Sequence, residues 1–268
     1  MCEDPFTDFD WAAHWRRLVE AGEVQGRNRL APEYWDARAR SFAYASGSEP
    51  PDFLEFLEPF LSPDKTLIDV GCGTGVHAAP LAARLARVTA VEPSAGMREH
   101  IPRLANLTVV PRAWQDAEVE AADLVISSHV LYYIPDPVPF LEKMEARARE
   151  RCFLQLIDDR GTELFGQLWE LLSGRRRGRV PRFFDAYNLL RWMGVRPAVT
   201  TLDTSDEPRW ESFDRAVEDC RARLGEIWME DVGRSWLADH LRPAPEGGVC
   251  FTEGGFRPSS VAHWRSRR

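Results

Sequence analysis

The stretch Thr66–Gly75, which reads TLIDVGCGTG, constrains the fold of this chain more than any other. Its first half is a short apolar run with β-branched residues, as in a strand covered on both faces of a parallel sheet. Gly71, Gly73 and Gly75 follow at alternate positions. Glycine tolerates positive φ and lets the backbone approach a ligand closely. A helix that begins near Thr74 would point its unpaired N–H groups at the same place. We therefore expect a strand–turn–helix unit that binds a nucleotide-like ligand.

Two classes of nucleotide ligand fit such a turn, and an ordinary tight turn is the alternative to both. The dinucleotide fingerprint G-x-G-x-x-G requires its third glycine where this chain has Val76. Here the spacing is G-x-G-x-G, and Asp69 precedes the turn. This pattern, Asp-x-Gly-x-Gly-x-Gly after an apolar strand, resembles motif I of class I S-adenosylmethionine (SAM) methyltransferases. The resemblance implies SAM as cofactor, bound by Asp69 and by four residues of the turn: Gly71, Cys72, Gly73 and Gly75.

The order of apolar segments indicates the fold class. Strand-like runs alternate with helical patterns, which is typical of a doubly wound, mostly parallel α/β sheet. With the resemblance, which covers about residues 54–202, the expected sheet has seven strands. Residues 248–251 and 260–264 resemble the final strands of a C-terminal antiparallel hairpin.

The second strand of this series, residues 88–91, ends at Glu92. An acid at this point, about twenty residues beyond the first glycine, can accept hydrogen bonds from both ribose hydroxyls of a nucleoside. We therefore expect Glu92 to bind the ribose of SAM. The alternative is a solvated acid at a strand end, and in either case we expect such an acid to have few packing contacts.

The resemblance also implies contacts to the adenine and the methionine chain of SAM. We expect them from the following residues: Pro93, Met97, Ala113, Trp114 and Ser128. Trp114 stands where the family has a different neighbour, so it either stacks on the base or packs in the core. The acid that contacts adenine in the family is then shifted to Asp116.

The acceptor side of the crevice is expected at the end of the fourth strand, residues 123–128, because ligands bind at the carboxyl ends of parallel strands. Asp123 corresponds to the motif IV aspartate of the family. His129 and Tyr133 follow as candidate catalytic residues, since an imidazole can accept a proton or orient a nucleophile. The alternative for His129 is a hydrogen bond to the backbone beside SAM. Asp158 and Asp159 end the fifth strand and are candidates for binding a cationic group, or for capping a helix.

We expect helical segments to cover or extend this unit. Residues 1–61 form a helical N-terminal cover, and residues 62–268 form the SAM-binding domain with a helical insertion at about 205–242. The insertion includes a long amphipathic helix from Trp210. Residues 34–39 resemble the aromatic-rich segment that closes over SAM in many small-molecule methyltransferases, or else they form a core-facing stripe.

Composition limits the class of partner. The net charge of -8 argues against general binding to nucleic acid or to an anionic membrane. The five cysteines lack C-x-x-C pairs, so we expect neither a disulfide scaffold nor a metal site. No leader or membrane-spanning run is recognisable, which favours the cytoplasm. The basic loop at 174–179 either captures an anionic group or is a solvated surface loop. The sequence leaves the oligomeric state open.

The pattern as a whole predicts a methyltransferase that moves a methyl group to an N, O, S or C atom of a small molecule. In the resembled family the protein supplies mainly alignment and desolvation. The alternatives are a methyltransferase that acts on RNA or protein, and a SAM-binding protein without catalysis. A nicotinamide-dependent dehydrogenase is disfavoured by Val76.

Overall fold

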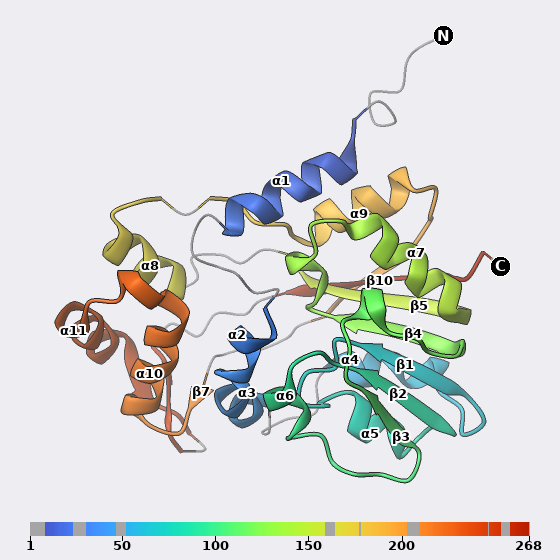
Figure 1. Cartoon of the computed structure of the whole chain (residues 1–268), viewed down its shortest axis with the longest axis horizontal. Coiled ribbons are helices and arrows are strands. Elements are labelled where there is room, and N and C mark those ends of the chain that lie inside the picture. Colours follow the sequence, from blue (N-terminus) through green and yellow to red (C-terminus); the bar gives the residue numbers. More distant parts are fainter. Residues whose placement is uncertain are drawn as a thin grey trace.

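A sheet of seven strands forms the centre of the structure (Figure 1). The computed structural model describes the chain except for residues 1–8, 24–30, 47–51, 159–163, 177, 203–208, 246, 253–257 and 268. The strands of the central sheet lie in the order β3-β2-β1-β4-β5-β10-β6. Their bounds are β1 (Thr66–Val70), β2 (Arg87–Val91), β3 (Leu107–Val110), β4 (Ala122–Ser128), β5 (Ala148–Ile157), β6 (Ala198–Leu202) and β10 (Ser259–Arg265).

The direction of the strands confirms the predicted doubly wound, mostly parallel architecture. β3, β2, β1, β4 and β5 pair in parallel with their neighbours. β10 runs antiparallel between β5 and β6. Since parallel strands end at one edge, the segments that follow β1, β2, β4 and β5 all emerge on the same side of the molecule.

The predicted C-terminal hairpin is wrong. β9 (Val249–Phe251) pairs with β7 (Arg209–Trp210) and β8 (Leu241–Pro243) in a separate sheet of three strands. β10 inserts instead into the central sheet, where Ser259 is opposite Ile157 and Leu202. Both segments are strands, as their composition predicts, but alternation of side chains does not identify the pairing partner.

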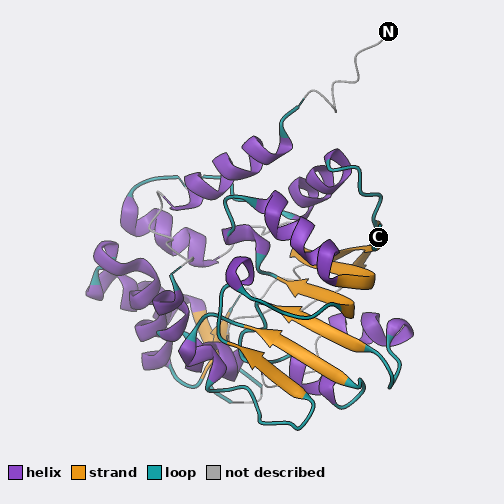
Figure 2. Cartoon of the chain, turned by 45° about the vertical axis from the view of Figure 1, so that its right-hand side comes forward, coloured by secondary structure: helices purple, strands orange, loops and turns teal. Residues whose placement is uncertain are grey.

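Helices cover both faces of the sheet (Figure 2). On one face, Ile68 of β1 packs in a cluster with Trp15 and Phe140. On the other face, Leu67 packs in a cluster with Phe53. The covering helices are α1 (Trp11–Glu23), α7 (Pro137–Arg147) and α9 (Phe183–Trp192) on the first face, and α4 (Asp52–Leu57) and α5 (Ala78–Ala82) on the second.

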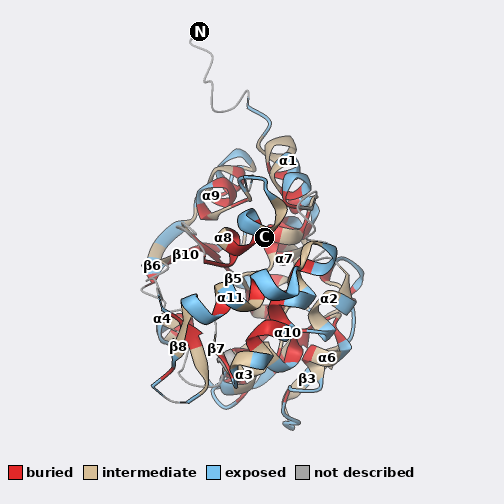
Figure 3. Cartoon of the chain, turned by 90° about the vertical axis from the view of Figure 1, so that its left-hand side faces the viewer, coloured by how far each residue is buried: buried red, intermediate tan, exposed pale blue. Residues whose placement is uncertain are grey.

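The remaining helices lie beyond the carboxyl edge of the sheet. α2 and α3 contact α6, and α3 also contacts β7. α8, α10 and the small sheet share a third apolar cluster that includes Trp169 and Trp210, and their buried faces are visible in Figure 3. The bounds are α2 (Pro32–Asp36), α3 (Ala39–Ser46), α6 (Ala95–Arg98), α8 (Leu164–Ser173), α10 (Phe213–Leu224) and α11 (Glu230–His240). The division into a cover at 1–61, a domain at 62–268 and an insertion at 205–242 stays a prediction, and residues 205–208 lie outside the described residues.

Local capping explains one further difference from the predicted elements, at the start of α10. Trp210 belongs to a strand, and the helix begins after it because the hydroxyl of Ser212 accepts the N–H of Arg215 at 3.3 Å. Pro80 lies in the first turn of α5, where proline is tolerated. Gly194 has a φ of 79° after α9, a conformation that is common for a glycine at a helix end.

Candidate active site

The glycine turn after β1 has the backbone conformation that its sequence predicts. Gly71, Gly73 and Gly75 have φ angles of 70°, 56° and 81°. A Cβ added at Gly71 would lie 2.5 Å from Cγ2 of Val130, and one added at Gly73 would lie 3.5 Å from the ring of Phe42. The first contact is closer than carbon atoms tolerate, so the turn and the loop after β4 approach one another only because position 71 lacks a side chain.

Glu92 is buried beside this turn, with 6% of its surface exposed. Its Oε2 accepts the N–H of Gly73 at 2.9 Å, and its Oε1 accepts the N–H of Ser94 at 2.8 Å. The carboxylate therefore fixes both the glycine turn and the start of α6. The alternative of a solvated acid with few contacts is wrong. Burial raises the pKa of Glu92, although its two backbone hydrogen bonds oppose that shift.

Asp69 is a second buried acid of the site. One of its oxygens accepts a backbone hydrogen bond from Ala78, at the start of α5, and its Oδ2 has no partner among the described residues. Burial and, second, the neighbouring Glu92 raise the pKa of Asp69 to about 7. Two carboxyl groups therefore lie close together in a place that disfavours negative charge, and a cation bound there would relieve that cost.

Asp36 joins the cover to the site, and sequence reasoning did not find it. Its Oδ1 accepts the hydroxyl of Ser94 at 2.5 Å and the N–H of Gly96 at 2.8 Å. These hydrogen bonds hold the pKa of Asp36 below its usual range. A Cβ at Gly96 would lie 2.9 Å from Cα of Asp36, so α2 docks tightly on α6. A cap between residues 58 positions apart leaves no local sequence signal.

His129 lies at the carboxyl end of β4 in an unusual backbone conformation. Its φ is 59°, and it is the non-glycine residue with positive φ among the described part of the chain. Its N–H donates to the carbonyl of Gln155 at 3.0 Å, and its Nδ1 lies 3.1 Å from the hydroxyl of Tyr132. That hydroxyl also accepts the N–H of Ile157. Strained residues of this kind cluster at functional sites, where the surroundings hold them in place.

Polar side chains continue this network along the ends of β4 and β5. The hydroxyl of Ser128 donates to Oε1 of Gln155 at 2.8 Å, and Nε2 of Gln155 donates to the hydroxyl of Ser259 at 2.8 Å. Ser128 thus supports the acceptor side, and its predicted contact with SAM stays a prediction.

The aromatic segment of α2 meets the loop after β4. The rings of Trp35 and Tyr133 lie edge to face, with centroids 5.7 Å apart. The guanidinium of Arg38 lies 5.3 Å from the ring centroid of Tyr34, and its Nε donates to Asp219 of α10 at 3.1 Å. The structure therefore brings together the predicted aromatic cover, the acceptor-side tyrosine and the insertion.

Trp114 belongs to the core and not to a stacking surface. It is 4% exposed, and its indole N–H donates to the carbonyl of Phe140 at 3.2 Å. The ammonium of Lys143 lies 4.9 Å from its ring centroid. Of the two interpretations of Trp114, packing is the one that the structure shows. Ala113 directly precedes the short helical turn that carries Trp114, and Asp116 is exposed at the end of that turn.

Three further predicted cofactor contacts, Cys72, Pro93 and Met97, lie in the segments that follow β1 and β2. Cys72 lies inside the turn, and burial raises the pKa of its thiol. Met97 is 2% exposed in α6, and the carbonyl of Pro93 accepts a hydrogen bond from Arg98 at 2.6 Å. All three adjoin Glu92 or the glycine turn in sequence, and their contacts with SAM stay predictions.

Asp123 lies at the opposite edge of the sheet, so its assignment as a motif IV residue of the site is wrong. It is the second residue of β4, and its Oδ2 accepts the N–H and the hydroxyl of Thr66, each at 2.7 Å. It therefore stabilises the amino ends of β1 and β4. Asp158 does lie at the acceptor edge, where its Oδ2 accepts the hydroxyl of Ser260 at 2.8 Å. Asp159 lies outside the described residues.

The basic loop at 174–179 is partly neutralised. Arg179 donates to both carboxylate oxygens of Asp185, at 2.8 and 3.0 Å. Arg177 lies outside the described residues. Among the residues that the structure describes, no helix has the length and apolar character needed to cross a membrane.

A doubly wound sheet, a glycine turn with positive φ and a buried acid at the end of the next strand together define a nucleoside-binding α/β protein of the methyltransferase class. Residues 35–195 match the family described as methyltransferase domain, which is more than half of the chain. The chain belongs to this family, and it is a SAM-dependent methyltransferase.

The chain is also similar to proteins of two bacteria. A protein of Haemophilus influenzae described as uncharacterized is 27% identical over 209 residues, which is 74% of this chain and 77% of the relative. An uncharacterized methyltransferase of Mycobacterium tuberculosis is 32% identical over 115 residues, 40% of this chain and 57% of the relative.

Among solved structures, magnesium protoporphyrin IX methyltransferase of Synechocystis PCC 6803 has a TM-score of 0.50 at 15% identity, over 80% of each chain. A putative methyltransferase from an antibiotic biosynthesis pathway of Anabaena variabilis has a TM-score of 0.53 at 16% identity, over 79% of this chain and 96% of the other. At these identities the likeness shows the fold.

Proposed function

We propose that this methyltransferase acts on a small molecule that binds between the carboxyl edge of the central sheet and the aromatic segment of α2. The observation that carries the proposal is the contact between Trp35 and Tyr133, whose ring centroids are 5.7 Å apart. It places an aromatic wall directly over the loop that follows β4. Pockets lined by aromatic side chains with a few polar groups are typical of small-molecule sites.

The residues present fit SAM. The three glycines with positive φ leave three positions of the turn without side chains, and a Cβ at Gly71 would collide with Val130. Glu92 would accept the ribose hydroxyls with the lone pairs that Gly73 and Ser94 leave unused. Asp69, with its unpartnered Oδ2, supplies negative charge beside the turn. When bound, SAM supplies a methyl group activated by a positively charged sulfur.

The chain's own residues then align the acceptor and exclude water. A hydroxyl or carbon acceptor would lose a proton as it takes the methyl group and the sulfur leaves as S-adenosylhomocysteine, whereas a free amine or thiolate would attack without losing a proton first. His129 is the proposed proton acceptor, with Tyr133 as part of the acceptor wall. For this role Nδ1–H of His129 would donate to the hydroxyl of Tyr132, which puts the lone pair of the imidazole on Nε2.

The negative charge of the chain supports a small acceptor over RNA, since the net charge is -8. The ion pair of Arg179 with Asp185 also supports a small acceptor over RNA, because it engages one cation of the basic loop. Similar solved structures include coclaurine N-methyltransferase with N-methylheliamine, at a TM-score of 0.50 and 15% identity, so enzymes of this fold act on small amines.

The test is a labelling experiment with SAM that carries a radioactive methyl group. The protein is incubated separately with the small molecules, the RNA and the protein of a cell extract, and excess S-adenosylhomocysteine serves as the control. We expect label in the small-molecule fraction that the control abolishes. Label in RNA or protein alone would refute the small acceptor. SAM binding without transfer to any fraction would favour the non-catalytic alternative.

A further inference from the structure

A cavity of about 440 Å³ lies at the edge of the sheet opposite the glycine turn. The register fixes this position, because Arg265 at the end of β10 is opposite Arg151 near the start of β5. The glycine turn and Glu92 follow the carboxyl ends of β1 and β2. The cavity is therefore separate from the site of methyl transfer.

The cavity lies where the pairing between β10 and β6 ends. The pairing of β10 with β6 stops at His263 and Ala198, while β10 continues to Arg265. Pro197, directly before β6, has no N–H with which to extend the ladder. Gly194, with its φ of 79°, turns the chain away after α9. The last residues of β10 thus lack a neighbouring strand on that side.

Arginine side chains dominate the lining of the cavity, although the chain as a whole is acidic. Arg151, Arg196, Arg265 and Arg267 line it, and no acidic residue does so among the described residues. Arg267 is paired with Glu145 at 2.5 Å, and Arg151 donates to Nδ1 of His263 at 3.3 Å. Neither Arg196 nor Arg265 forms an ion pair within the described part of the chain, so their charge is uncompensated there.

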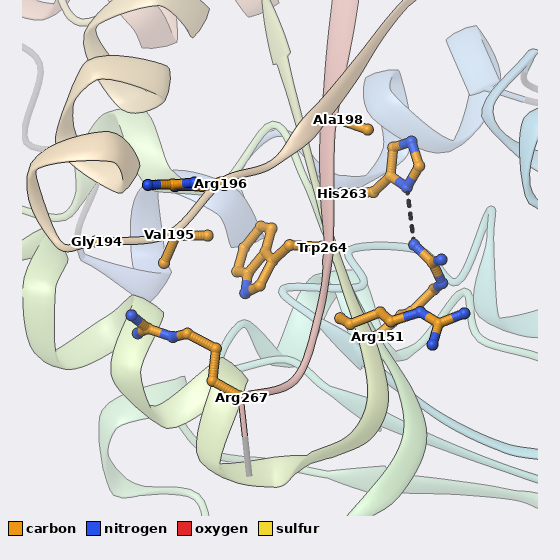
Figure 4. Close-up of a pocket in the computed structure, with 9 residues that line it drawn as sticks. Arg151, Gly194, Val195, Arg196, Ala198, His263, Trp264 and Arg267 are labelled. Atoms are coloured by element: carbon orange, nitrogen blue, oxygen red, sulfur yellow. Dashed lines mark hydrogen bonds between the residues drawn. The ribbon is translucent and has the colours of Figure 1, made fainter.

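A buried donor provides a second, independent observation. Trp264 is 4% exposed, and its indole N–H has no hydrogen-bond partner among the described residues. Trp264 lines the same cavity, and Figure 4 shows its indole between the side chains of Arg196 and Arg267. A buried donor without an acceptor is destabilising, and an anionic oxygen placed between these two arginines supplies one.

We propose that this cavity, through Arg196, Arg267 and Trp264, binds a small anionic molecule by a phosphate or carboxylate group. The planar guanidinium group matches both anions with two parallel hydrogen bonds, and the indole N–H adds a third donor. The volume suits a small molecule. A nucleic acid is disfavoured, since the surface around the cavity belongs to a chain of net charge -8.

The experiment follows the indole N–H signals of the ¹⁵N-labelled full chain by NMR during titration. Inorganic pyrophosphate and citrate are the two probes, which separate a phosphate from a carboxylate ligand, and sodium chloride at matched ionic strength is the control. The Trp264→Phe variant identifies the Trp264 signal among the ten tryptophans of the chain. We expect a saturable shift of that signal with at least one probe and none with chloride.

A pair of matched variants tests the site itself. Arg196→Gln removes an unpaired cation of the cavity, whereas Arg103→Gln removes an exposed arginine from a loop next to β3, far across the sheet. We expect Arg196→Gln to weaken binding at least fivefold and Arg103→Gln to leave it unchanged, by the NMR titration and by calorimetry.

Equal weakening in both variants, or no saturable shift with either probe, would overturn the proposal. If Trp264→Phe does not fold, backbone assignment identifies the signal, and the calorimetric comparison of the two arginine variants decides without it. Both measurements are made without SAM, so their result is independent of methyl transfer.

Discussion

Replacement of Glu92 by alanine tests the central contact of the site. Glu92 is 6% exposed and accepts the N–H groups of Gly73 and Ser94 at 2.9 and 2.8 Å. The substitution therefore affects folding as well as SAM binding. The two effects are separable because one is measured without ligand and the other by titration of folded protein.

The stability effect follows from the two N–H groups that lose their acceptor. Ser94 is fully buried, so its N–H has no replacement, and a buried unsatisfied group costs roughly 1–3 kcal/mol. Gly73 is partly exposed, so water compensates part of its loss. Removal of one carboxyl also relieves Asp69, whose pKa Glu92 raises. The net expectation is a decrease of about 2 kcal/mol in the free energy of unfolding.

The binding effect follows from the charge-assisted hydrogen bonds that we propose Glu92 accepts from the ribose of SAM. Their loss weakens binding by about 2 kcal/mol, which is roughly a 30-fold increase in Kd. Glu92→Gln keeps an oxygen for one of the two N–H groups but loses the charge. We expect it to be more stable than Glu92→Ala while binding SAM about as weakly.

Urea unfolding at pH 7 measures the first effect, and isothermal titration with SAM measures the second. Glu99→Ala is the matched control, because Glu99 is an exposed acid at the end of the neighbouring α6. The reasoning fails if Glu92→Ala binds SAM as tightly as Glu99→Ala. An unchanged free energy of unfolding would show that the hydrogen bonds to the turn contribute nothing.

Three further predictions concern protons and motion. The pKa of Asp69 is raised to about 7, so the folded state keeps a proton that the unfolded chain loses near pH 4. Urea unfolding should show the free energy of unfolding falling between about pH 4 and 7, less steeply in Asp69→Asn, and equal slopes would contradict this. His129→Asn is the variant of choice because asparagine tolerates the positive φ. If His129 is the base, this variant should lower kcat roughly a hundredfold and change the Kd of SAM less than about threefold. Near wild-type turnover would remove His129 from the mechanism. Residues 32–46 and 210–241 should gain hydrogen-exchange protection with S-adenosylhomocysteine, and equal protection without it would indicate a fixed structural role.

The parts of the site that the sequence predicts are those written in contiguous residues. The glycine turn is one such part, since three glycines at alternate positions have few other uses after a buried strand. The place of Glu92 is another, because one strand and one helix separate it from the turn. Parallel pairing of β1 with β2 then brings Gly71 and Glu92 to the same edge.

The parts that the sequence does not predict depend on distant segments. The cap of α6 by Asp36 joins residues 58 and 60 positions apart. The pairing of β10 with β5, and not with β9, depends on which strand edge is open when the chain returns to the sheet. Trp114 carries the same composition signal whether it stacks on a base or packs on α7, so only the fold decides. The positive φ of His129 likewise follows from its contacts with β5.

The electrostatics of the turn distinguish its two possible ligands more sharply than the glycine spacing does. A dinucleotide presents a pyrophosphate to the helix that follows the first strand, where free N–H groups and the helix dipole attract negative charge. In this chain the start of α5 already donates to a carboxyl group, that of Asp69, and Glu92 accepts the N–H of Gly73. A pyrophosphate would therefore meet two buried acids and a turn with fewer free donors. A nucleoside with a positively charged sulfur meets the opposite field, because its charge stabilises the ionised form of Asp69. From the arrangement of these acids we therefore expect this turn to bind SAM in preference to a dinucleotide.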